Sequence, residues 1–173
     1  LRPGPRQRES WVYGDNFFVW GMLETPSAVE DAPNDISMYA VEGYWEGDST
    51  SLRRHTLRLD GFGSIHAPYA GGDVVTKPFV FEGEALSVNA DTSGFGSFRV
   101  EVQTADGTPL EGLSLNDCEP IFCDSVAYRV HWGERCDLRA LGGRPVRLKF
   151  ALRDADVYSF RFAGLNDRDE SER

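Results

Sequence analysis

The side chains best suited to chemistry in this sequence are carboxylates that stand near aromatic residues. Asp15, Glu42, Glu46 and Asp48 flank the aromatic stretches of the N-terminal third. Glycoside hydrolysis usually needs two carboxyl groups about 5–10 Å apart in one cleft. In a chain with 28 acidic residues, however, some pair meets that distance by chance. The pattern therefore assigns catalysis to none of these carboxylates.

Four aromatic residues, Trp11, Tyr13, Tyr44 and Trp45, form the candidate binding surface. Turn-forming residues and glycines surround them, and such segments can present rings outward. Two interpretations are open. The rings stack on the apolar faces of pyranose sugars, or they pack against another protein surface. A sugar site would place one or two exposed rings beside Asp, Asn or Arg, whereas a packing surface is a broad apolar patch.

Three aspartates could hold a structural calcium ion. Asp154 and Asp156 stand two residues apart in a polar stretch, and Asp60 follows an expected strand. Calcium prefers carboxylate and carbonyl oxygens, and it can tie neighbouring strands together. The alternative is that Asp154 and Asp156 only form an Asx-type turn. We favour the turn and keep calcium as the alternative.

The other metal-ligating and nucleophilic residues indicate no site. The histidines are far apart and lack HxH or HxxxH spacing, at His55, His66 and His131. No GxSxG, P-loop or dinucleotide fingerprint is present. The odd number of cysteines allows one disulfide, most simply between the first two of Cys118, Cys123 and Cys136.

Charge and hydropathy exclude two classes of partner. The net charge is −10, from 28 acidic and 18 basic residues, whereas nucleic-acid binding needs a basic face. No apolar run is long enough to span a membrane. The sequence has no apparent signal segment, but it begins at Leu1, so a removed leader would be invisible. The compartment stays open, with a secreted or periplasmic location preferred.

The stretch Arg144–Phe162 shows the clearest secondary-structure pattern. Apolar and polar residues alternate on both sides of the polar segment Arg153–Asp156. Alternation of this kind is typical of a strand with one buried face. The stretch therefore predicts an antiparallel hairpin that turns at Arg153–Asp156, and its apolar face requires a second sheet to cover it.

Similar short runs fill most of the chain and predict an all-β protein. About ten strands separated by turns, and a single helical turn at 137–141, indicate a two-sheet antiparallel β-sandwich or jelly roll. We expect an N-terminal β appendage over 1–50, the sandwich over 51–163 and a disordered charged tail over 164–173. The predicted core contains Leu57, Val88, Val100, Val130, Leu148 and Phe160.

Several long phrases resemble a known family. The chain resembles the C-terminal region of bacterial five-bladed β-propeller glycoside-hydrolase-like proteins, a group that includes invertases and arabinanases. The resemblance covers residues 50–163 and extends loosely over the first 50. The phrases that carry it are LRRHTLRLDGFGSIHAPYAGG, TKPFVFEGEAL, GTPLEGLSLNDCEPIF, LGGRPVRLKF and DADVYSFRF.

The resemblance implies a specific domain arrangement. In such proteins a propeller carries the catalytic carboxylates and precedes a β-sandwich. The first 50 residues are too few for five blades and resemble the closing strands of the last one, so no catalytic residue is carried over. We therefore expect a non-catalytic accessory module that packs against a propeller or partner chain, including a second copy of itself. The alternative is a free-standing carbohydrate-binding module, and a glycoside hydrolase is the third possibility.

Overall fold

A computed structural model describes residues 18–19, 21–30, 32–43 and 50–167 of the chain. The chain divides into two compact units, 1–59 and 60–173, which are described separately. Every regular element of the described residues is a β-strand except one short 3-10 turn, and all strand pairs are antiparallel. The prediction of an all-β antiparallel fold is confirmed.

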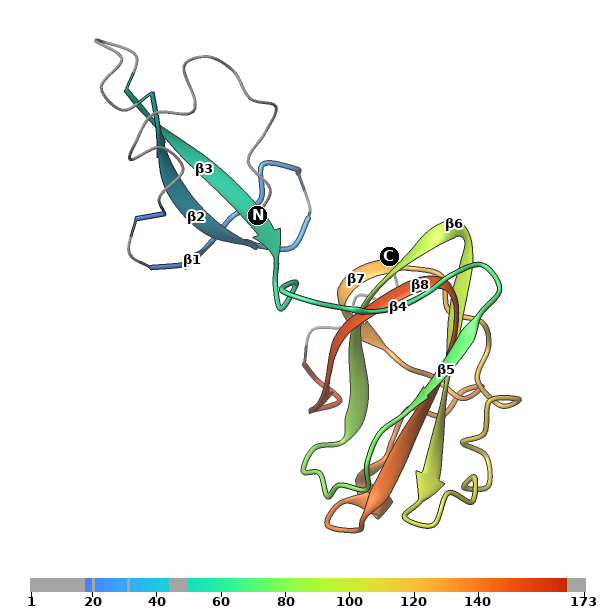
Figure 1. The fold of residues 1–173 in the computed structure, drawn as a ribbon. Helices are drawn as coiled ribbons and strands as arrows, with labels where there is room; N and C mark the ends of the chain where they lie inside the picture. Colours follow the sequence, from blue (N-terminus) through green and yellow to red (C-terminus); the bar gives the residue numbers. More distant parts are fainter. Residues whose placement is uncertain (1–17, 20, 31, 44–49, 168–173) are drawn as a thin grey trace. The chain divides into compact units, whose positions relative to one another are not determined.

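The first unit contains a three-stranded sheet (Figure 1). Strand β2 (Asp35–Glu42) lies between β1 (Leu23–Thr25) and β3 (Ser51–Arg58). β3 pairs with β2 along its whole length. The division between the units therefore falls after Leu59, whereas the sequence analysis placed it after residue 50 and assigned β3 to the sandwich.

A hydrogen-bonded arginine links the strands of this sheet. The Arg54 guanidinium of β3 donates to the Ser37 hydroxyl at 2.7 Å and to the Thr25 hydroxyl at 2.8 Å. It also donates to the Pro26 carbonyl at 2.9 Å. One side chain thus holds all three strands in register, because Thr25 belongs to β1 and Ser37 to β2.

The second unit contains a five-stranded sheet. Its strands follow the order β4-β8-β6-β7, and β5 also pairs with β8. Their bounds are β4 (Ile65–Ala67), β5 (Gly72–Val75), β6 (Ala85–Thr104), β7 (Asp124–Arg129) and β8 (Val146–Ala163). The two long strands carry most of the pairing, and the shorter strands lie along their edges.

Strands β6 and β8 bend together, and Figure 1 shows two halves of the ribbon facing each other across the unit. β8 is one strand throughout, so the hairpin turn predicted at Arg153–Asp156 is wrong. Instead, the pairing register shifts between Thr92 and Ser97, and Asp154 has a φ of 46°. A β-bulge of this kind bends a strand without ending it. The folded sheet is sandwich-like as predicted, while jelly-roll connectivity stays a prediction.

The bulge changes which side chains of β8 face the core. Leu148, Phe150 and Leu152 are buried before it, whereas Ala155 and Val157 are buried after it. The inward positions have moved by one residue across this irregular segment, where residues 93–96 of β6 face only Asp154 of β8. A second register shift follows between Asn89 and Ala90 of β6.

The hydrophobic core lies between the two halves of the folded sheet. Four of the predicted core residues belong to it, at Val88, Val100, Val130 and Leu148. Two predictions were wrong. Phe160 is 37% exposed, although it pairs with the buried Val88, and Leu57 pairs with Ile36 in the first unit. Trp132 also belongs to the core, where its indole N–H donates to the Val100 carbonyl at 2.8 Å.

The remaining predictions on local structure have mixed outcomes. The helical turn is present as the 3-10 turn η2 (Arg139–Leu141). None of the three cysteines forms a disulfide in the structure, so the Cys118–Cys123 bridge is not formed. Residues 164–167 of the expected disordered tail form a turn whose Gly164 and Leu165 carbonyls accept hydrogen bonds from Arg129. Residues 168–173 lie outside the described part of the chain. In that described part, no helix has the length and apolar character to cross a membrane.

Candidate functional site

The four residues of the aromatic site predicted from the sequence all lie outside the described part of the chain. They are Trp11, Tyr13, Tyr44 and Trp45. It also holds for three of the four carboxylates considered for hydrolysis, at Asp15, Glu46 and Asp48. The fourth, Glu42, forms an ion pair with Arg53 at 2.8 Å.

The three candidate calcium ligands do not form one group. Asp60 accepts a hydrogen bond from Ser159, Asp154 from Ser93, and Asp156 from Ser64. Among residues 18–19, 21–30, 32–43 and 50–167, no cluster of three His, Cys, Asp or Glu side chains is arranged to hold a metal ion. Each carboxylate instead fastens a different segment to β8 or to its neighbour.

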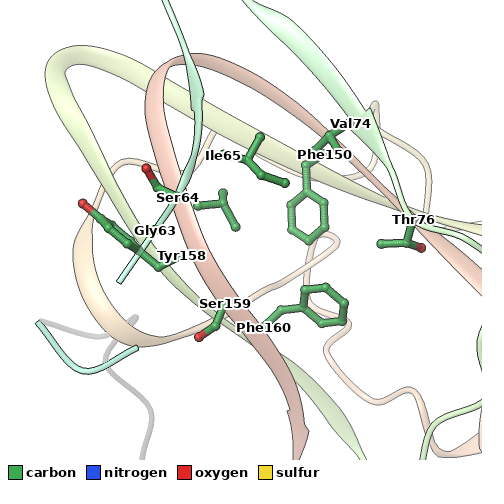
Figure 2. Close-up of a pocket in the computed structure, with 10 residues that line it drawn as sticks. Gly63, Ser64, Ile65, Val74, Thr76, Phe150, Tyr158, Ser159 and Phe160 are labelled. Atoms are coloured by element: carbon green, nitrogen blue, oxygen red, sulfur yellow. The ribbon is translucent and has the colours of Figure 1, made fainter. Parts of the chain in front are cut away.

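The clearest candidate site is a hollow beside β8 in the second unit, drawn in Figure 2. We call it the β4–β5 hollow. Its volume is about 540 Å³, which is within the usual range for small-ligand sites, roughly 300–1,000 Å³. The described residues that line it are Gly63, Ser64, Ile65, Val74, Thr76, Phe150, Val157, Tyr158, Ser159 and Phe160.

The strand pairing explains why a hollow forms here. β4 pairs with β8 at residues 155–157, and β5 pairs with β8 at residues 149–152. The two short strands thus cover different parts of the same edge of β8. Figure 2 shows the side chains of Ile65, Phe150 and Phe160 around the space between these segments.

Aromatic rings form one wall of the β4–β5 hollow. The Phe160 ring centroid lies 5.9 Å from that of Phe150 and 5.9 Å from that of Phe79. These tilted arrangements are favourable for aromatic pairs. Phe150 is 2% exposed, whereas Phe160 is 37% exposed, so the wall runs from the core to solvent.

The hydroxyl groups around the hollow already take part in internal hydrogen bonds. The Ser64 and Ser159 hydroxyls donate to Asp156 and Asp60. The Thr76 hydroxyl oxygen accepts from the Leu148 N–H at 3.0 Å. Figure 2 shows the Tyr158 hydroxyl pointing away from the phenyl rings. The space in the middle is therefore apolar.

The Asp156 carboxyl group, beside the hollow, makes the stability of this region depend on pH. Burial raises the pKa of its carboxyl, but hydrogen bonds from Ser64 and with His66 outweigh burial, so the pKa is lowered overall. The His66 Nδ1 lies 3.0 Å from the Asp156 carboxylate.

A lowered pKa makes a definite prediction for Asp156→Asn. A carboxyl whose pKa is lower in the folded state stabilises the protein above its unfolded pKa, about 3.9, and this contribution is lost as pH falls through the folded pKa. We expect Asp156→Asn to lose about 1 kcal/mol of unfolding free energy at pH 7, because the contact is partly exposed. Urea denaturation should show the two proteins converging as pH falls through the lowered folded-state pKa of Asp156. A gap that stays constant over the acidic range would contradict this role.

The β4–β5 hollow offers mainly apolar surface. None of the described residues that line it is a histidine, cysteine, aspartate or glutamate. Its Ser64 hydroxyl is held by the Asp156 carboxylate, which also contacts His66. Sequence reasoning missed this site because alternation marked Phe150 and Phe160 alike as core. Alternation does not show that Phe160 is 37% exposed in the folded chain.

Comparisons with known proteins do not identify a family for the chain. No family model, curated protein or solved structure matches the chain. The site must therefore be interpreted from its own geometry.

Proposed function

We propose that the second unit is a non-catalytic β-sandwich module that packs against an apolar surface of a partner protein through the β4–β5 hollow. The proposal rests on the hydroxyl groups at the hollow, which already take part in hydrogen bonds within the chain. The hydroxyls of Ser64 and Ser159 are already committed to Asp156 and Asp60. What remains for a ligand is the apolar surface of Ile65, and of the two phenylalanines beside it.

This surface suits a protein side chain better than a sugar. A sugar ring carries several hydroxyl groups that need hydrogen-bond partners when they leave water. An aliphatic or aromatic side chain has no such need, and its burial contributes about 25 cal/mol per Å² of apolar area. Protein interfaces are commonly centred on such a buried apolar or aromatic anchor.

An accessory role beside a glycoside-hydrolase-like domain is the more specific form of this proposal. It is supported by the resemblance of Leu52–Gly72 and the later phrases to the region that follows a propeller. The carbohydrate-binding alternative through Trp11, Tyr13, Tyr44 and Trp45 concerns residues outside the described part and stays a prediction.

Sedimentation velocity over a range of protein concentrations tests the packing role. An isolated chain with an exposed hollow should self-associate, because a second copy can cover the apolar surface. We expect Ile65→Asp to shift the protein to monomer, since it places a charge at the edge of the hollow. Ile65 is 49% exposed, so the substitution should leave the fold intact, which circular dichroism will verify.

Val29→Asp is the matched control. Val29 is a similarly placed surface residue, 68% exposed, in the first unit. It should leave self-association unchanged. A wild-type chain that stays monomeric at every concentration would overturn the packing role, and so would equal effects of the two substitutions.

A further inference from the structure

A second hollow lies at the bend of β6 and β8, and it differs chemically from the first. Its volume is about 560 Å³, and we call it the bend hollow. Two phenylalanines at its rim are strongly exposed, Phe95 at 84% and Phe122 at 63%. Large exposed rings that line one hollow are typical of a binding surface. Two arginines, Arg99 and Arg153, line the same space.

Phe95 belongs to the bulged segment of β6, residues 93–96, which is held in place by contacts with Asp154 of β8. The Ser93 hydroxyl donates to the Asp154 carboxylate and also accepts the Phe95 N–H at 3.2 Å. Gly96 packs so closely on the Asp154 carbonyl oxygen that a Cβ atom there would overlap it. The exposed ring is thus presented by a fixed, bulged segment of β6, which lowers the entropy lost on binding.

The second ring is fastened to the same part of the sheet. The Thr92 N–H donates to the Cys123 carbonyl at 2.8 Å, directly after Phe122. Ile121, directly before it, exchanges two backbone hydrogen bonds with Phe98. Both rims of the bend hollow are therefore anchored to β6.

The two arginines give the bend hollow a positive character. Ser97 pairs with Arg153 and Arg99 pairs with Ala151, so the arginines are diagonal neighbours on one face of the sheet. Among the described residues, no carboxylate forms an ion pair with either guanidinium. This is notable in a chain of net charge −10. The Arg153 guanidinium lies 3.9 Å from the Tyr69 ring centroid, which orients it.

The backbone around the bend hollow is already paired, and this bears on the class of ligand. On one side, Phe98 of β6 exchanges hydrogen bonds with Ile121. On the other, Leu152 of β8 pairs with Gly72, and the Asp154 N–H donates to the Pro68 carbonyl. A peptide that adds a strand needs a free sheet edge. Recognition at this place must therefore use ring faces and guanidinium groups.

We propose that the bend hollow binds an acidic oligosaccharide built of uronic acids. Pyranose rings have apolar faces that pack on Phe95 and Phe122. Their carboxylates accept charge-assisted hydrogen bonds from Arg99 and Arg153, because a guanidinium matches a carboxylate in geometry. A chain of uronates repeats its carboxylates, so it can engage both arginines at once. This site is separate from the β4–β5 hollow and does not depend on the packing role.

Isothermal titration calorimetry with the full chain tests the proposal. The probes are oligomers of galacturonate, of mannuronate and guluronate, and of glucuronate-containing glycosaminoglycan. Methyl-esterified galacturonate oligomers serve as the uncharged counterpart of the same ring. We expect binding of at least one uronate series, at least tenfold weaker binding of the methyl ester, and weakening with added salt.

Two variants and a control locate the site. Phe95→Ala and Arg153→Gln should each reduce uronate affinity at least tenfold. Phe62→Ala removes a ring that is 66% exposed but does not line the bend hollow, and it should bind as wild type does.

Three results would overturn the proposal. They are failure of the wild type to bind any of the uronate series, unchanged binding in both site variants, and binding of poly-glutamate as tight as that of the uronates. The last result would assign the site to acidic peptides instead. None of them bears on self-association through Ile65, so failure here leaves the packing role standing.

Discussion

Replacing Phe150 with alanine is expected to lower the free energy of unfolding by about 3–5 kcal/mol. Phe150 is 2% exposed and lies in the first half of β8, where it pairs with Val100 of β6. Truncation removes its buried ring and leaves a cavity between the two halves of the folded sheet. Urea denaturation, monitored by circular dichroism, measures the loss.

Phe160→Ala is the control for this prediction. Phe160 lies on the same strand and has the same chemistry, but it is 37% exposed on the far side of the bulge. We expect it to cost about 1 kcal/mol, since a partly exposed ring loses less burial on truncation. Equal losses in the two variants would contradict the assignment of Phe150 as a fully buried core residue and of Phe160 as a partly exposed one.

Strand pattern alone was sufficient to predict the fold class and much of the core. Val88, Val100, Val130 and Leu148 were placed in the core because apolar and polar residues alternate around them, and all four are buried. Alternation works here because each strand of the second unit has one face toward the opposite half of the sheet. It does not state which strands pair. The partner of β3 was therefore not predictable, and β3 proved to belong with β2.

The bend in β8 shows why the rest could not be predicted. The polar segment Arg153–Asp156 has the composition of a turn, and composition alone cannot distinguish a turn from a bulge in a continuous strand. The pairing of this segment with β6, which lies about 60 residues earlier in the chain, determines that it forms a bulge and not a turn. The irregular pairing at Asp154 makes Ala155 and Val157 the buried positions, and a second register shift, between Asn89 and Ala90, then places Phe160 opposite the buried Val88. Phe160 is nevertheless 37% exposed, which alternation along the sequence could not show.

The candidate sites depend on the same bend. The aspartates of the calcium hypothesis, Asp60, Asp154 and Asp156, accept hydrogen bonds from serines of separate segments. Asp154 fastens the bulged segment of β6 that carries Phe95, and Asp156 contacts Ser64 and His66 beside β4. A sequence indicates such carboxylates, but only the folded sheet shows which hydroxyl each one meets.

Gly96→Ala should therefore disturb both the stability and the surface of the bend. A Cβ atom at this position would overlap the Asp154 carbonyl oxygen and come within 3.0 Å of the Arg153 carbonyl oxygen. Both obstacles are backbone atoms, so the strands themselves must move apart. Overpacking of this kind typically costs about 1–3 kcal/mol. We expect a loss of that size in urea denaturation, together with weaker binding of uronate oligomers because Phe95 is displaced.

The neighbouring glycine provides a control that separates this overlap from a general loss of flexibility. A Cβ atom at Gly94 would meet nothing within 4 Å. Gly94→Ala should thus be neutral, or stabilising by about 0.4–1 kcal/mol, because alanine restricts the unfolded chain more than glycine does. If the two substitutions had equal effects, close packing of Gly96 on β8 could not be what holds the bulged segment of β6. A large loss confined to Gly96→Ala would show that this segment is held by its close packing on Asp154, and through it by the pairing of β6 with β8.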